Sequence, residues 1–371
     1  MHKIESTLLA AFVSATLVSG AALADDSAPL DRSIAYAIYD IQWSLYQTKD
    51  AKDECPSGLA QLGPREQFKA KFSGTNQKLA ETQLVYESDI WFPSEQPDQF
   101  PFREAGGKIA IGLDLDGKTK PTDFLSPDGK SGIDNQLFRV IGCIGNFRDG
   151  SAILEADKHS LTNRGSDRMV VELTDVDSLV NDDDVTITTY HGRDPLVRDA
   201  TGATFQPGGT QRLDLRWGKN YIHQGKAKIV GGMLMTTDPM KDFLMPHEGI
   251  AEAAADEWMR DARFALKLTP AKAEGLIAGY ADVEAWYRAR TRMWSTHHLS
   301  YGQQAQASIY RELRKLADGF PDPQTGMNTA ISASYSVKMI QVRVIRPPKD
   351  VAKRDSDAAA RQFATSASTG N

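Results

Sequence analysis

Residues 335–344 read Tyr-Ser-Val-Lys-Met-Ile-Gln-Val-Arg-Val and show the pattern that dominates this chain. Apolar and polar side chains alternate, as on a strand with one buried and one exposed face. The apolar set changes parity between Met339 and Ile340. A β-bulge there would explain the change, because one extra residue reverses the side-chain phase. Two short strands, or a strand buried on both faces, would explain it as well.

The same alternation recurs upstream, in residues 109–115, 169–173, 185–188, 212–217 and 227–235. It is typical of antiparallel sheets with one wet face. No strand–helix–strand rhythm appears, which disfavours a parallel sheet. We therefore expect a mainly β fold with inserted helices (α+β). Its antiparallel β-sandwich-like domain would be built from the β-rich residues 105–245 and 330–346.

Helical spacing interrupts the strands over residues 247–320, where we expect a three-helix subdomain before the last strand. The first helix would run from Ile250 to Ala265, the second would open at Thr269-Pro270, and the third would cover Ala305–Leu316. Gly275 and Gly279 in the second helix predict the close approach of a packed neighbour. A further apolar pattern within residues 25–50 also fits a helix.

The amino terminus predicts export. A basic start, an apolar run and the small-x-small sequence Ala22-Leu23-Ala24 form a secretory signal peptide over residues 1–24. Residues 25–350 would then be a single mature domain and residues 351–371 a disordered tail of small and polar types. The expected location is periplasmic or secreted, with no transmembrane segment after signal cleavage.

The chain has two cysteines, Cys55 and Cys143, and both follow the predicted cleavage site. An even number in an oxidising compartment favours one disulfide. Two buried thiols are the alternative.

Composition excludes some partners. The net charge of −6 disfavours binding to nucleic acid, because phosphate contacts need clustered Lys and Arg. Residues 112–119 match the letters of a phosphate-binding loop, Gly-x-x-x-x-Gly-Lys-Thr. However, Asp114 and Asp116 place negative charge inside it, and turn residues follow where a helix should begin. We therefore expect no nucleotide.

Acidic and amide side chains concentrate between residues 114 and 135, interleaved with glycines. Calcium takes six to eight oxygen ligands from such groups. Residues 128–135 locally resemble the Asp-rich calcium loops of thrombospondin type 3 repeats, without their repeated Asp-x-Asp-x-Asp-Gly core. The candidate Ca²⁺ ligands are Asp114, Asp116, Asp123, Asp128, Asp134 and Asn135. A solvated turn region is the alternative, and Asp134 or Asn135 could instead cap the apolar segment that follows.

We expect a secreted or periplasmic non-enzymatic binding or structural protein, stabilised by Ca²⁺, with an unidentified ligand or a cell-envelope partner. The alternative is a periplasmic hydrolase acting on a polysaccharide or ester, with carboxylates in residues 114–134 or 175–184. The sequence does not decide whether the protein is an enzyme.

Overall fold

The computed structural model describes residues 29–59, 102–151, 168–215, 218–245, 257–291 and 306–348, with Leu154, Glu155, Lys158 and Leu161. The predicted signal peptide (1–24) and the predicted tail (351–371) lie outside the described residues.

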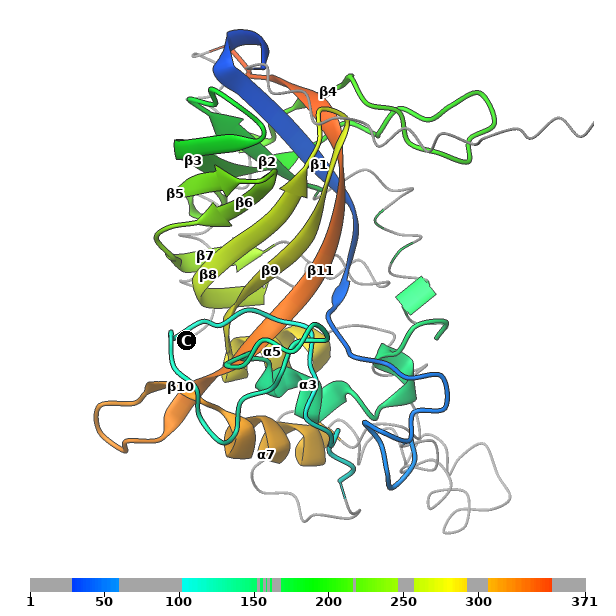
Figure 1. Cartoon of the computed structure of the whole chain (residues 1–371), viewed down its shortest axis with the longest axis vertical. Helices are drawn as coiled ribbons and strands as arrows, with labels where there is room; N and C mark the ends of the chain where they lie inside the picture. Colours follow the sequence, from blue (N-terminus) through cyan, green and yellow to red (C-terminus); the bar gives the residue numbers. More distant parts are fainter. Residues whose placement is uncertain are drawn as a thin grey trace, which may run out of the picture.

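Eight antiparallel strands form a closed barrel (Figure 1). Each pairs with the next in chain order, and the last pairs back with the first. The strands are β1 (Ser33–Trp43), β2 (Arg168–Thr174), β3 (Asn181–Gly192), β5 (His223–Val230), β6 (Met233–Thr236), β8 (Glu257–Leu268), β9 (Lys272–Asp282) and β11 (Asn328–Ile345). The β-rich class is confirmed, but the predicted sandwich is wrong. Alternating apolar residues predict that one face of a strand is buried. They do not predict whether that face is covered by a second sheet, as in a sandwich, or by the opposite wall of the same sheet, as in a barrel.

Three short strands and several helices complete the fold. β4 (Gly209–Arg212) pairs in parallel with β11, β7 (Met240–Met245) pairs with β8, and β10 (Gly319–Pro321) pairs with the start of β11. The α-helices α3 (Gln136–Ile141), α5 (Val283–Thr291) and α7 (Gln306–Leu316) gather at one end of the barrel (Figure 1). Single 3-10 turns occur at Leu30–Arg32, Gly145–Phe147 and Lys219–Tyr221. No helix in the described ranges is long and apolar enough to cross a membrane.

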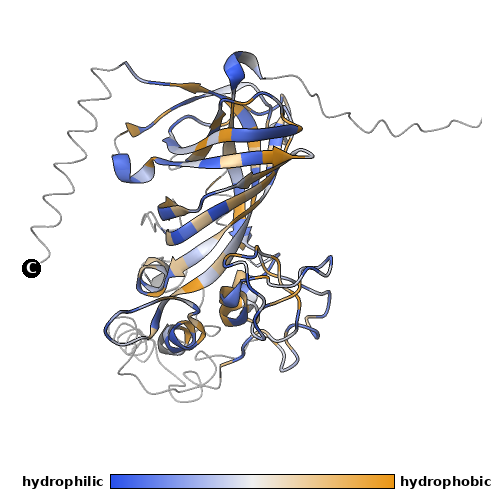
Figure 2. Ribbon diagram, turned by 60° about the vertical axis from the view of Figure 1, so that its left-hand side comes forward, coloured by the Kyte–Doolittle hydropathy of each residue, from blue (hydrophilic) through white to orange (hydrophobic). Residues whose placement is uncertain are grey.

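The barrel interior is the main hydrophobic core. Tyr335, Val337 and Met339 of β11 point inward and join Phe243 and Phe264 in one buried cluster. Hydrophilic and hydrophobic residues mix along the strands (Figure 2), as expected where side chains alternate between two faces. The interior is therefore filled by side chains.

The parity change in β11 has a packing cause. Met339 belongs to the interior core, whereas Ile340 and Val342 join a second cluster on the outer face. Leu196 and Phe205, from the excursion between β3 and β4, belong to that outer cluster. The strand is thus buried on both faces here, which was one of the three expected explanations.

The first two predicted helices of the 247–320 insertion are wrong where the structure describes them. Residues 257–268 and 272–282 are the adjacent strands β8 and β9, and α5 begins only at Val283. A Cβ at Gly275 would lie 2.0 Å from the Ala265 carbonyl oxygen, so glycine permits the close approach of the neighbouring strand. The third helix is confirmed as α7, Gln306–Leu316.

Other local predictions fail for similar reasons. The helix expected within residues 25–50 is strand β1, because tertiary pairing with β2 and β11 overrides the helical spacing. Residues 109–115 form only isolated bridges, to Leu125 and Asp134. Residues 227–235 are divided between β5 and β6 by a turn at Gly231-Gly232, both with positive φ.

Candidate metal centre

The loop of residues 109–135 lies against the outer wall of the barrel. Single bridges tie the loop to itself, including Phe124 to Ile133 and Leu113 to Asp134. Leu115 packs with Ala278 and Tyr280 on the outer face of β9. This packing fixes the acidic part of the loop beside β9 and β11.

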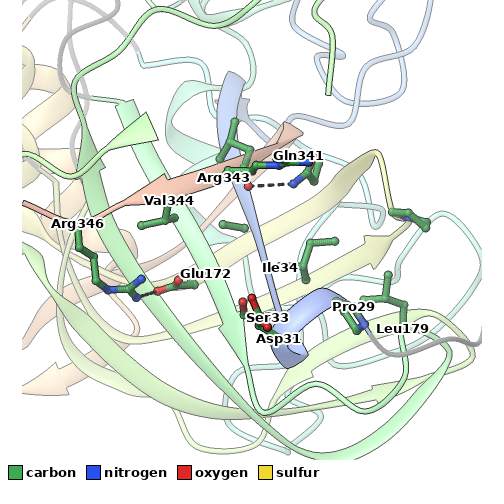
Figure 3. Close-up of a pocket in the computed structure, with 13 residues that line it drawn as sticks. Pro29, Asp31, Ser33, Ile34, Glu172, Leu179, Gln341, Arg343, Val344 and Arg346 are labelled. Carbon is green, nitrogen blue, oxygen red and sulfur yellow. Dashed lines mark hydrogen bonds and ion pairs between the residues drawn. The ribbon is translucent and has the colours of Figure 1, made fainter. Parts of the chain in front are cut away.

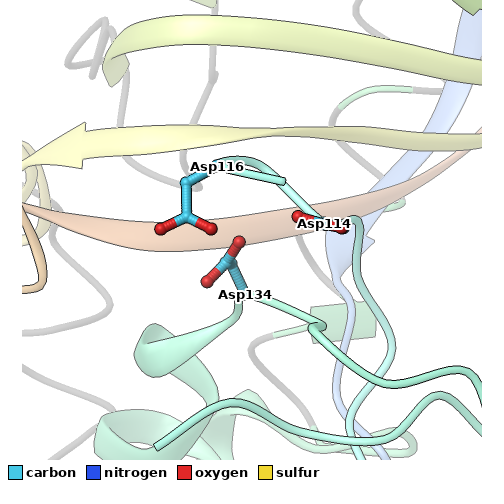
Figure 4. Close-up of side chains that lie close together, drawn as sticks. All are labelled: Asp114, Asp116 and Asp134. Atoms are coloured by element: carbon cyan, nitrogen blue, oxygen red, sulfur yellow. The ribbon is translucent and has the colours of Figure 1, made fainter. Parts of the chain in front are cut away.

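Three carboxylates of this loop converge on one point. Asp114, Asp116 and Asp134 each offer an oxygen, and these oxygens all lie within 4.8 Å of one another. The carboxylates of Asp116 and Asp134 point toward each other (Figure 4). Three converging carboxylate oxygens make a ligand set suited to a hard divalent cation.

Backbone amides hold each carboxylate through one oxygen. Asp114 Oδ1 accepts from Gly117 N (2.7 Å), and Asp116 Oδ1 accepts from Lys118 N (2.9 Å). Asp134 Oδ2 accepts from Leu115 N (2.7 Å). The second oxygen of each aspartate is not held by these amides, and that of Asp116 pairs with the Lys120 ammonium.

Asp134 is the most constrained of the three. Its side chain is 0 % exposed, and its Oδ1 atom is buried with no hydrogen-bond partner among the described residues. A buried carboxylate oxygen without a partner is costly. A bound cation would remove that cost.

Burial and neighbouring carboxylates shift the pKa values of the acidic groups at this site. The pKa of Asp134 is raised to about 6, mainly by burial and also by the carboxylates of Asp116, Asp123 and Asp318, while the hydrogen bond from the Leu115 N–H opposes the rise. Burial also raises the pKa of Asp318, although Ser332 donates to it from both its hydroxyl and its N–H. The site therefore combines several carboxylates at low solvent exposure.

Lys120 is the local counter-charge. Its ammonium forms an ion pair with Asp116 Oδ2, and this contact raises the pKa of Lys120. Burial opposes ionisation of Asp116, yet the hydrogen bonds from Lys120 and from the Lys118 N–H leave its pKa below the usual value. A cation at this point would therefore compete with the Lys120 ammonium.

The structure brings together only part of the predicted ligand set. Asp123 accepts from Lys120 N (2.5 Å) and contributes charge without joining the three converging carboxylates. Asp128 is exposed and accepts from the Ser126 hydroxyl within its own turn. Asn135 is the N-cap of α3, accepting from Phe138 N and donating to two carbonyls. The capping alternative is thus confirmed for Asn135, and Asp128 and Asn135 do not belong to the cluster.

The second acidic stretch does not reach this cluster. Asp182 accepts from the N–H groups of Asp177 and Asp184, and the Asp184 carboxylate pairs with Lys226 (2.7 Å). These contacts organise the turn between β2 and β3. Residues 175–184 therefore form a charged loop at the end of the sheet and do not share a cation site with this cluster.

Lys120 and Asp318 lie at this site without being among the predicted ligands. Lys120 lies four residues after Asp116, a spacing that is visible in the sequence but has no meaning outside a helix unless the turn is known. Asp318 precedes β10 and is distant from the loop in sequence. Only the tertiary fold places it near Asp134.

No protein-family model, curated protein or solved structure matches this chain.

In the presence of a chelator, raising the pH should remove a stabilising contribution that Asp134 makes at low pH. The pKa of Asp134 is about 6 in the folded state, above the unfolded value of ~3.9. The folded state therefore binds more protons between these values, and this stabilisation is full below about pH 4 and lost as pH rises through about 6. We expect the free energy of unfolding to fall by roughly 2–3 kcal/mol over this interval from Asp134 alone.

Denaturant unfolding in chelator at several pH values measures this slope. The Asp134→Asn variant supplies the control, because it keeps the other titrating groups, including His191, whose pKa burial lowers to about 4. The free energy of unfolding of the wild type minus that of the variant should therefore fall as the pH rises. A difference between wild type and variant that stays constant from about pH 4 to pH 7 would contradict the assignment.

Proposed function

We propose that this chain is an exported, non-enzymatic binding protein in which one Ca²⁺ ion fastens the 109–135 loop to the outside of the β-barrel. The observation that carries the proposal is the buried, unpartnered Oδ1 of Asp134, which lies among the carboxylates of Asp114 and Asp116. The remaining ligands would be water or backbone carbonyls, which calcium accepts readily.

The disulfide between Cys55 and Cys143 supports the exported location, because such bonds persist in oxidising compartments. The hydrolase alternative calls for two carboxylates across a cleft, commonly ~5–10 Å apart. The carboxylate oxygens of this cluster lie within 4.8 Å of one another, which suits a shared cation better.

The direct test is thermal unfolding of the mature chain, residues 25–371, in about 10 mM CaCl₂, in the same concentration of MgCl₂, and in EGTA. An ion that binds only the folded state at about one hundred times its Kd adds ~2.7 kcal/mol. This corresponds to a rise of roughly 4 °C in Tm for a chain of this length. An equal Tm in all three solutions would overturn the proposal, and a rise with Mg²⁺ alone would reassign the ion.

Lys120→Gln should increase the affinity for Ca²⁺ by about tenfold, because the cation would no longer displace an ammonium from Asp116. In chelator the same variant should be less stable, since the carboxylates lose their counter-charge. Isothermal titration with Ca²⁺ measures the first effect. Lys118→Gln is the matched control, because Lys118 serves the cluster through its backbone N–H, and we expect less than about a threefold change. Equal affinities in Lys120→Gln and wild type would show that Lys120 does not compete with the ion.

A further inference from the structure

A cavity of about 640 Å³ opens where β11 parts from β1, at the end of β11 opposite the helices (Figures 1 and 3). Ser33 and Ile34 line one side of it, and residues 342–344 line the other. The cavity has the size of an ordinary ligand pocket. It is far along β11 from the Asp cluster, so a ligand here is independent of the proposed cation.

The backbone of β11 directs alternate residues to opposite edges. The carbonyls of Gln341 and Ile345 accept from Gly208 N and Leu213 N, so odd-numbered residues face β4. The carbonyl of Ser334 accepts from Ser44 N at the end of β1, so even-numbered residues face β1. The N–H and C=O of Val344 therefore point toward β1.

The same reasoning applies to β1. The carbonyl of Arg32 accepts from Val176 N, just after β2, so even-numbered residues at this end face β2. Ser33 and Ala35 then face β11. Ala35 is paired with Val342, and continued pairing would place Ser33 opposite Val344. The pairing between the two strands ends at Ala35 and Val342, so Ser33 and Val344 face each other across the cavity without being paired.

The wall beside this gap carries charge of both signs and apolar surface. Glu172 of β2 is buried and pairs with Arg346 (2.5 Å), whose side chain is half exposed (Figure 3). Ile34 and Leu179 add apolar atoms. Such a wall accepts side chains of mixed character and does not select one charge.

We propose that this gap binds an extended peptide segment, which enters as an additional strand between Ser33 of β1 and Val344 of β11. An extended peptide offers N–H and C=O groups at both of its edges, so it can bond to β1 on one side and to β11 on the other. Main-chain hydrogen bonds supply affinity in this mode of recognition, and side-chain pockets supply selectivity. The partner is thus a protein with an exposed, extended, β-forming segment.

The test uses the mature protein and a fluorescein-labelled peptide of about seven alternating valines and threonines, followed by fluorescence anisotropy. The matched probe carries the same side chains with N-methyl groups on the amides that would pair. We expect saturable binding of the first peptide and binding at least about tenfold weaker for the methylated one, as the loss of one or two hydrogen bonds requires.

Val344→Pro removes the N–H that faces the gap and should weaken binding by about tenfold, whereas Val344→Ala keeps that N–H and should weaken it by less than about threefold. Thermal unfolding checks that both variants fold, and the comparison of the two peptides on wild-type protein tests the proposal without any variant. Three results would each overturn strand addition: no binding of the parent peptide, equal binding of both peptides, or equal binding by wild type and a folded Val344→Pro. None of them bears on the calcium site.

Discussion

Asp134→Asn should raise the Tm of the protein in chelator and abolish the further rise that Ca²⁺ produces in the wild type. The substitution removes a buried charge while leaving an oxygen that can accept from Leu115 N. Its new amide group can donate to the carboxylates of Asp114 or Asp116. We expect a gain of roughly 1–3 kcal/mol at pH 7 in chelator, because ionised Asp134 is held at an unfavourable site.

In Ca²⁺ the order of stabilities should reverse. The wild type gains the binding free energy of the ion, ~2.7 kcal/mol at one hundred times Kd, and the variant lacks the central ligand. Thermal unfolding of both proteins in the two solutions measures the full cycle.

Asp128→Asn is the matched control, since Asp128 belongs to the same loop and lies outside the cluster. It should keep the calcium-dependent rise of the wild type. A calcium-dependent rise that survives in Asp134→Asn would remove Asp134 from the site. A loss of stability in chelator would show instead that the Asp134 carboxylate is favourable without an ion.

Replacing both Cys55 and Cys143 with alanine should cause a large loss of stability. The disulfide joins residues 88 apart in sequence, and closing a loop of that length constrains the unfolded chain by about 4–5 kcal/mol. It also fixes the end of α3 against the segment that holds Glu54, which forms a buried ion pair with Arg148 (2.5 Å). Denaturant unfolding of the double variant and of the wild type measures the difference.

Reductant provides the control for this prediction. It should lower the stability of the wild type toward that of the double variant and leave the double variant unchanged. A loss below about 1 kcal/mol in the variant would mean that the bond does not constrain the unfolded chain as expected.

The sequence pattern predicts the type of element correctly where only one face of that element is buried. β3 alternates over Val185, Thr186 and Ile187 because one face looks into the barrel, and α7 matches its predicted helix because one helical stripe meets the core. The cysteine count predicted the disulfide, and the Asp-rich stretch predicted Asp114, Asp116 and Asp134 as neighbours.

Patterning failed where two layers cover one strand. β9 is buried on both faces over much of its length, with Ile277 inside the barrel and Tyr280 under the 109–135 loop, so its apolar residues lose the period of two. The alanines of β8 and β9 and the paired glycines of β9, Gly275 and Gly279, then match a helix. In the structure the two glycines leave room for the backbone of β8.

Local composition determined that the chain is rich in antiparallel strands, bears one disulfide and carries an acidic loop. Those features depend on residues that are near one another in sequence or on simple counts. Closure of the barrel through β1 and β11, the approach of Asp318 to Asp134, and the unpaired edge at Ser33 and Val344 all depend on segments about 150 to 310 residues apart. Such contacts form only when the whole sheet curves onto itself, because the burial that stabilises each one is supplied by all the others.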